Sequence, residues 1–175
     1  FKKNNFIKEK INQLDLINSK VQLNIDKTGS KLDLSGKYSF GEKNFLPFNL
    51  GYSYANKNSK IRVLADFDKE VEIFLINYKK QKGNISNISI DMNKSKNNLN
   101  INEVNYTEGK NSISAKGLKF KKGQFSSFDQ IFIKTFKNNT KNNDFSVTFG
   151  AELKIKGNQF DATNLPKVFS KKTSS

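Results

Sequence analysis

The stretch FSVTFGAELKIKG, residues 145–157, carries the longest alternation of apolar and polar side chains in the chain. One set of alternate positions is apolar: Phe145, Val147, Phe149, Ala151, Leu153 and Ile155. The other set is small or polar: Ser146, Thr148, Gly150, Glu152, Lys154 and Lys156. A period of two places each set on its own face of a β-strand, one face dry and the other wet. We therefore expect a half-buried antiparallel strand that ends at Gly157.

The same period of two recurs along most of the chain, in VQLNI (21–25), LDLSGKYSF (32–40), LPFNLGYSY (46–54) and KIRVLADF (60–67). Turn-forming segments rich in Gly, Asn and Lys separate these runs, as in a β-meander, sandwich or barrel. The alternation shifts by one residue in NLNINEVNY (98–106) and in ISAKGLKF (113–120), which predicts β-bulges that let a sheet curl. The expected fold class is mainly β, with a long curled antiparallel sheet, a taco-like groove or a β-roll, over residues 21–160.

Two segments before the quoted stretch depart from this pattern. Residues 1–20 place Ile7, Ile11, Leu14 and Ile17 at steps of four, three and three, which favours a short helix. Residues 71–78, VEIFLINY, are apolar on both faces and indicate a strand that is covered on both sides.

The segment that follows Gly157 changes from strand to helical spacing. Leu165, Val168 and Phe169 stand at positions i, i+3 and i+4, which predicts a short amphipathic helix over residues 161–171. We expect Phe160 to fold back toward the apolar face and Asp161 to cap the helix. This terminal cap would protect a sheet edge or form a hinge between successive segments of a groove.

The side-chain inventory removes several kinds of catalytic site. The chain contains no cysteine and no histidine, so thiol nucleophiles, imidazole bases and the usual zinc ligands are absent. The run DFDKEVE (66–72) has alternate carboxylates, but Val71 and Asn77 stand where an EF-hand loop needs Gly and Glu. We expect this run to be a charged strand edge and turn, and we expect no catalytic residue, no metal and no cofactor.

The strong positive charge invites a second class of function. Lysine and arginine number 31 against 16 aspartate and glutamate residues, which gives a net charge of +15. Lysines attract nucleic acid because they displace counterions from phosphate. However, Arg62 is the only arginine, although arginine is the side chain best suited to phosphates and base edges. We expect no specific nucleic acid partner, and a basic nucleic-acid-binding module is the least favoured alternative.

Residues 118–136, LKFKKGQFSSFDQIFIKTF, followed by residues 145–171, FSVTFGAELKIKGNQFDATNLPKVFSK, resemble the AsmA-like family of bacterial envelope proteins of the TamB/YhdP type. The matching features are an LKFKKG strand and turn, the strand FDQIFIKT, and the segment IKGNQFDATNLPK. The family pattern has a strand, Gly, an apolar residue, Asp, a small residue and then a leucine-bearing helix. It corresponds here to Ile155, Gly157, Phe160, Asp161, Ala162 and Leu165.

The resemblance implies a curved β-groove in a protein of the bacterial periplasm, anchored to the inner membrane by a segment not included here. It implies a non-enzymatic role, in which the groove shields phospholipid acyl chains during transport between membranes. Bacterial membranes would be contacted through other parts of a longer elongated protein, of which residues 1–175 form one β-rich segment. The groove residues expected are Leu118, Phe120, Phe145, Val147, Phe149, Ala151, Leu153 and Ile155. A structural or adhesion module with a closed core remains the main alternative.

Overall fold

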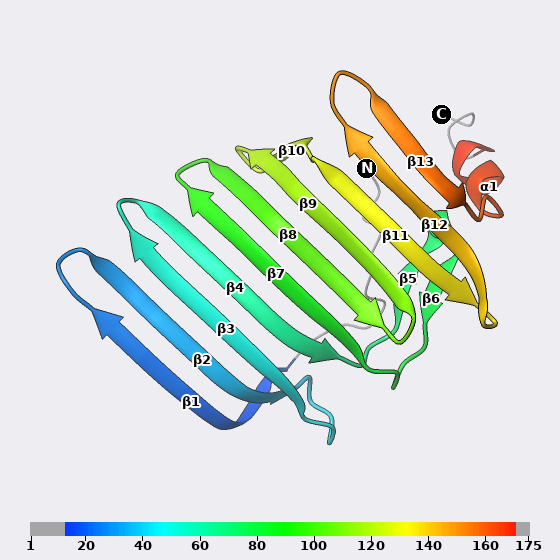
Figure 1. The fold of residues 1–175 in the computed structure, drawn as a ribbon. Coiled ribbons are helices and arrows are strands. Elements are labelled where there is room, and N and C mark those ends of the chain that lie inside the picture. Colours follow the sequence, from blue (N-terminus) through cyan, green and yellow to red (C-terminus); the bar gives the residue numbers. More distant parts are fainter. Residues whose placement is uncertain (1–12, 171–175) are drawn as a thin grey trace.

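The structure is a computed structural model of the whole chain, and it describes residues 13–170, with the side chains of the last helix described as far as Lys167. It is mainly β, as predicted, and contains one large open antiparallel sheet (Figure 1). Ten strands follow one another as neighbours, in the order β1-β2-β3-β4-β7-β8-β9-β11-β12-β13. A short strand, β10, pairs with β9 and continues the line of β11.

The strands of this sheet are joined as a meander, because every neighbouring pair is antiparallel and most are joined by tight turns. Their bounds are β1 (Asp15–Ile25), β2 (Gly29–Ser39), β3 (Leu46–Ala55), β4 (Asn58–Phe67), β7 (Ser86–Ser95), β8 (Asn98–Glu108), β9 (Asn111–Lys121), β10 (Gln124–Ser127), β11 (Gln130–Lys137), β12 (Thr140–Phe149) and β13 (Leu153–Gln159).

The stretch 145–157 is a hairpin, so the prediction of one unbroken strand is wrong. β12 ends at Phe149, a turn follows, and β13 begins at Leu153. Phe149 pairs with Leu153, and Val147 pairs with Ile155. Partners in an antiparallel pair share a face, so the chain reverses without moving its apolar set to the other side. Of the predicted apolar positions, only Ala151 lies in the turn and therefore in neither strand.

Both predicted phase shifts are present in the sheet. The register between β7 and β8 changes between Asp91 and Met92, opposite the extra residue Asn102. In β9 the shift falls at Gly117, whose φ of +66° is adopted most easily by glycine. An added Cβ there would also overlap the carboxylate of Asp129. These bulges return the apolar residues on either side of them to the same face of the sheet.

The segment 71–78 is a two-stranded arm, and the prediction of a single covered strand is wrong. β5 (Val71–Ile73) leads into the 3-10 helix η1 (Phe74–Ile76), and β6 (Tyr78–Lys80) pairs back on β5. Asn77 makes this reversal with a left-handed φ of 51° while its backbone N–H donates to the Phe74 carbonyl. The arm, residues 71–80, leaves the sheet between β4 and β7 and lies behind β11 and β12 in Figure 1.

Both terminal segments differ from the sequence prediction. Residues 15–20 belong to strand β1 and not to a helix, because the edge of β2 offers them hydrogen-bond partners. Residues 1–12, with Ile7 and Ile11, lie outside the described residues. At the other end the helix, α1, spans Leu165–Ser170 and is shorter than predicted. The side chains of Val168 and Phe169 are likewise outside the described part of the chain.

Asp161 joins segments far apart in sequence and does not cap α1. Its carboxylate accepts hydrogen bonds from the backbone N–H of Thr163 at 3.1 Å, from Asn77 Nδ2 at 2.8 Å and from Asn142 Nδ2 at 3.1 Å. Its own backbone N–H donates to Asn143 Oδ1 at 2.9 Å. The segment after β13 is thereby tied to the arm and to β12.

Two asparagines complete this connection by binding the arm's backbone. Asn143, fully buried, donates from Nδ2 to the Ile76 carbonyl and to Thr135 Oγ1, each at 2.8 Å. Asn164 donates to the Phe74 carbonyl at 2.8 Å. Ile76 is buried, and its carbonyl at the end of a short helical turn needs such a donor. Together the two contacts hold the arm against the sheet.

We predict that Asp161→Asn destabilises the protein at neutral pH and that the difference fades in acid. Hydrogen bonds from Thr163, and then from Asn142 and Asn77, lower the pKa of Asp161 below its ordinary value of 3.8. A carboxylate with a lowered folded-state pKa contributes stability above its unfolded pKa, and this contribution is lost as the pH falls below about 4. Urea unfolding should show a loss of about 1 kcal/mol at pH 6 and a smaller loss at pH 2.5.

Asp33→Asn is the matched control, because Asp33 forms only an exposed ion pair with Lys31. Such pairs contribute little to stability, so this variant should resemble the wild-type protein at both pH values. Unfolding curves for Asp161→Asn that match those of the control would contradict the proposed connection.

Candidate functional site

One face of the sheet is apolar from edge to edge. Cross-strand partners share a face, so the register defines rows of side chains that run across the strands. The longest row takes one residue from each of the ten strands: Val21, Leu34, Leu50, Val63, Ile90, Val104, Ala115, Ile131, Val147 and Ile155. We call this side of the sheet the apolar face.

Neighbouring rows on the same side are also apolar. One of these rows crosses the strands nearer to the β7–β8 turn. It consists of Leu23, Leu32, Tyr52, Ile61, Met92, Ile101 and Leu118. Another row crosses the strands nearer to their opposite ends. It contains Phe48, Ala65, Ile88, Tyr106, Ile113, Ile133 and Phe145. The apolar face is therefore at least three rows deep over most of the sheet.

The structure brings together seven of the eight groove residues predicted from the sequence. Those on the apolar face are Leu118, Phe120, Phe145, Val147, Phe149, Leu153 and Ile155. Ala151 lies in the turn between β12 and β13 and does not join them. The sequence prediction covered only the C-terminal strands, although β1 to β8 contribute to the same rows.

The two outer strands expose this face most. Val21 at one edge and Ile155 at the other are 63% and 61% exposed. Side chains between them are half-buried, because each is flanked by neighbours in its row, while residues 13–170 place no second layer above it over much of the sheet. A continuous exposed apolar surface of this kind marks a binding surface in a folded protein.

The arm covers the apolar face at one corner. Ile76 and Tyr78 of the arm form a buried cluster with Ile133 of β11 and Phe145 of β12. Tyr78 donates a hydrogen bond to Glu108 Oε2 at 3.0 Å and lies 2.7 Å from the hydroxyl of Tyr106. Burial, together with this contact to Tyr106, raises the pKa of the Tyr78 hydroxyl. Both tyrosines therefore stay neutral and act as a polar boundary of the cluster.

The predicted terminal cap lies beside this cluster. Phe160 packs edge-to-face on Phe145, with ring centroids 5.1 Å apart, as the expected fold-back required. Gly157 makes this approach possible, since a Cβ there would come within 2.4 Å of Phe145. Leu165 is half-buried at the start of α1. The arm that this cap supports was not predicted; its only signal was that residues 71–78 are apolar on both faces of the expected strand.

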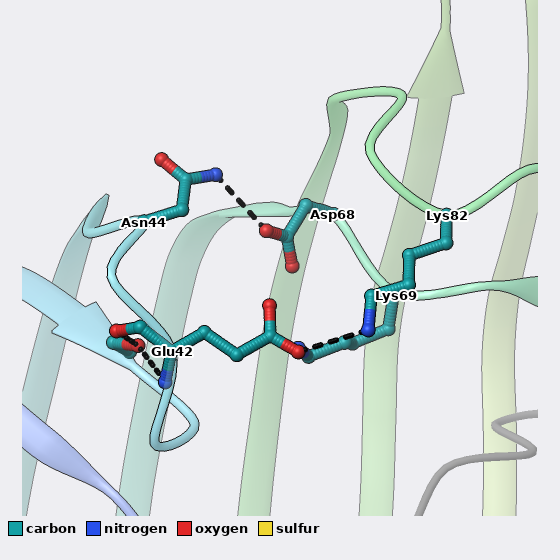
Figure 2. A network of polar contacts seen from close by, with 6 residues as sticks. Glu42, Asn44, Asp68, Lys69 and Lys82 are labelled. Carbon is teal, nitrogen blue, oxygen red and sulfur yellow. Dashed lines mark hydrogen bonds and ion pairs between the residues drawn. The ribbon is translucent and has the colours of Figure 1, made fainter.

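The acidic run 66–72 enters a polar network and does not converge on one point. Figure 2 shows Asp68 accepting a hydrogen bond from Asn44 at 3.0 Å, and Glu42 binding both Lys69 and Lys82. These lysines lower the pKa of Glu42. The network joins the β2–β3 loop to the start of the arm. Within residues 13–170, no group of three or more His, Cys, Asp or Glu side chains is placed to hold a metal ion.

The opposite side of the sheet is polar. Arg62 binds Asp91 at 2.9 Å, and the same row continues to the ion pair of Glu103 with Lys116 at 3.4 Å. Leu64 and Phe132 are exceptions on this side, 44% and 37% exposed. The two faces thus differ in kind: one offers mainly charged and polar groups to water, and the other offers mainly hydrocarbon and aromatic surface, with polar side chains such as Ser59 and Lys94 near the turns.

We predict that the apolar face is open around Ile61 and closed beneath the arm at Ile133. The chain has no cysteine, so a single Ile→Cys substitution at either position reports local access to a maleimide reagent. Ile133 is 8% exposed, so its labelling requires the arm to open first. The cysteine of Ile61→Cys should react with maleimide at least about tenfold faster than the cysteine of Ile133→Cys. Equally slow labelling at both positions would instead favour a closed core.

No helix in the described part of the chain is long and apolar enough to cross a membrane. No protein-family model matches the sequence, and no curated protein and no solved structure is similar enough to match. The resemblance to the AsmA-like family therefore depends on the motifs between residues 118 and 171.

Proposed function

We propose that this chain is a lipid-handling segment whose apolar face shields phospholipid acyl chains. The observation that carries the proposal is the apolar row that crosses all ten strands without a polar side chain, from Val21 to Ile155. A protein that needed only a stable core would be expected to cover such a row with a second layer. Here the arm covers one corner, and both outer strands stay exposed.

The dimensions of the face suit an acyl chain. Strands lie about 4.8 Å apart, so ten of them extend the row over roughly 40 Å. One leaflet of a bilayer is about 15 Å of hydrocarbon, so a chain could occupy successive positions along the row. Movement between positions replaces one apolar contact by another and leaves the hydrophobic free energy nearly unchanged. Headgroups would stay in water beyond the ends of the strands.

The resemblance to AsmA-like proteins supports the same role. By that resemblance the segment would belong to a longer periplasmic protein anchored to the inner membrane, in which such a face would continue as a conduit between membranes. No catalytic step is needed for this role. The main alternative is a structural β-module, and the buried cluster of Ile76, Tyr78, Ile133 and Phe145 is the observation in its favour.

Two adjacent residues of β4 provide the sharpest test of the proposal. Val63 lies on the apolar face, whereas Leu64 lies on the polar side and is the more exposed of the two. A photoreactive amino acid at Val63 should form adducts with phospholipid on illumination in cells, and mass spectrometry should identify an acyl chain. The same group at Leu64 should form few adducts.

Leu64 controls for mere exposure of an apolar side chain. Equal lipid adducts at Val63 and Leu64 would show unspecific contact with membrane lipid. Adducts with protein alone at Val63 would favour a structural module. Either result would overturn the proposed lipid-handling function.

A further inference from the structure

Five turns lie side by side at one end of the sheet, along the upper left edge in Figure 1. They connect β1 to β2, β3 to β4, β7 to β8, β9 to β10 and β12 to β13. Four of them carry an exposed lysine at or next to the tip: Lys27, Lys57, Lys96 and Lys122. We call these four residues the lysine rim.

The lysine rim has no acidic partners among the described residues. The ion pairs of the described residues involve other lysines, within the strands or at the opposite end of the sheet. Examples at the opposite end are Lys69 with Glu42 and Lys79 with Glu70. Two acidic residues lie near the rim and are already engaged. Asp26 accepts hydrogen bonds from the N–H groups of Thr28 and Gly29 in its own turn, and Glu152 pairs with Lys154. Asp26 keeps its negative charge, but it stands against four rim lysines, so this end of the sheet carries net positive charge.

Three of the rim lysines occupy unfavourable backbone positions. Lys57, Lys96 and Lys122 have φ values of 61°, 39° and 50°, in the left-handed region that disfavours side chains with a Cβ. Every other non-glycine residue with a positive φ in residues 13–170 is asparagine, which adopts this conformation most readily. At the opposite end, the β11–β12 turn uses Asn138 and Asn139 at the equivalent positions.

This difference points to a function for the lysine side chain. Asparagine is abundant in the chain and suits these positions better, yet lysine is present at three turns of one end only. Local backbone strain that stability does not require is characteristic of binding sites. At the other end, by contrast, Glu42, Asp68 and Glu108 accept contacts from nearby lysines and asparagines.

Exposed apolar side chains lie directly beside the lysine rim, on the apolar face. Ile25 is 73% exposed and adjoins the first turn, and Tyr54 is exposed next to the second. Phe125, 53% exposed, follows the turn that holds Lys122. Its ring packs on Phe120 at 5.7 Å, in a run of aromatic rings that continues to Phe149 near the fifth turn. Positive charge and insertable hydrocarbon thus occur together at this end.

A shallow hollow lies where these two features meet, between the β7–β8 and β9–β10 turns. Lys94, Lys96 and Lys122 line it, and Leu99 and Phe120 form its apolar part. Leu99 and Phe120 are cross-strand partners on the apolar face. A phosphate held by the lysines would leave attached hydrocarbon in contact with these two side chains.

From these observations we propose that the lysine rim docks on the surface of an anionic lipid bilayer. The lysines attract the phosphates of the headgroups, and Ile25, Tyr54 and Phe125 enter the boundary between headgroups and acyl chains. The strength of binding to a membrane surface is the sum of the electrostatic attraction and the contribution of inserted apolar side chains. The five turns form one row, so the sheet stands on the bilayer with its strand ends toward the lipid.

Nucleic acid fits this surface less well. The rim contains no arginine, the residue that best contacts phosphates and base edges. Beside the rim, the rings from Phe120 to Phe149 pack on one another, so they offer few free faces for stacked bases. An anionic bilayer satisfies both the charge and the adjacent apolar side chains.

This docking does not depend on the lipid-handling proposal. A rim that binds a bilayer needs only the turn tips and the side chains beside them, whereas acyl-chain shielding needs the rows in the middle of the sheet. The two proposals can therefore fail separately. If both hold, the rim would place the apolar face at the membrane surface from which lipid is taken.

The test is a triple variant, Lys57→Asn, Lys96→Asn and Lys122→Asn, in the full chain. Asparagine suits the left-handed positions, so the variant should fold at least as stably as the wild-type protein. Co-sedimentation would be measured with vesicles of phosphatidylcholine alone and with vesicles containing one third phosphatidylglycerol. Each lysine near an anionic surface strengthens binding about fivefold, so the variant should bind anionic vesicles about 100-fold more weakly.

A control variant removes the same charge from the other end of the sheet: Lys37→Gln, Lys43→Gln and Lys137→Gln. These three lysines are exposed and have no ion pair among the described residues. The control should bind anionic vesicles within about threefold of the wild-type protein, because only distant charge is lost. Wild-type binding should weaken in high salt and should be weak on phosphatidylcholine.

Three outcomes would overturn the inference. The first is equal loss of binding in the rim and control variants, which would show attraction by net charge alone. The second is equal binding to neutral and anionic vesicles. The third is displacement of the protein from anionic vesicles by a DNA duplex or an RNA at stoichiometric amounts, which would make nucleic acid the preferred partner. Photo-crosslinking at Val63 reports on acyl chains independently of all three.

Discussion

The rest of the structure depends on one constraint, the cross-strand register that keeps ten strands in phase. A shift of one residue in any strand would move its apolar side chains to the wet face. The meander avoids this by tight turns between most neighbours and by paired irregularities at Asn102 and Gly117, where β8 and β9 change phase together. The apolar face is the result of that register and not of a packed second layer.

The arm that covers one corner of the sheet needs specific contacts to fix its position. The arm could pack on the apolar face by hydrophobic contact alone, but such contacts do not define one position. The side chains of Asn143, Asp161 and Asn164 supply direction, because each binds a backbone carbonyl or an amide of the arm or of its neighbours. Specific hydrogen bonds therefore position the arm, and burial of Ile76 and Tyr78 stabilises it.

Much of this architecture follows from local patterns in the sequence, and the errors have identifiable causes. Alternation predicted the sheet and the shared face of Phe145, Val147 and Ile155, because a strand's periodicity is local. It could not show the reversal after Phe149, since a three-residue turn preserves the alternation through the hairpin. The arm and the continuous row across ten strands were missed because both arise from contacts between residues distant in sequence.

The exposed apolar face also couples binding to stability. A single-layer sheet leaves much of its hydrocarbon in water, so it gains less from burial than a two-layer domain of equal length. Any molecule that covers the face only in the folded state stabilises that state in proportion to the logarithm of its concentration over Kd. The arm already does this at one corner, from within the chain. An acyl chain on the row from Val21 to Ile131 would extend the same stabilisation across the rest of the sheet.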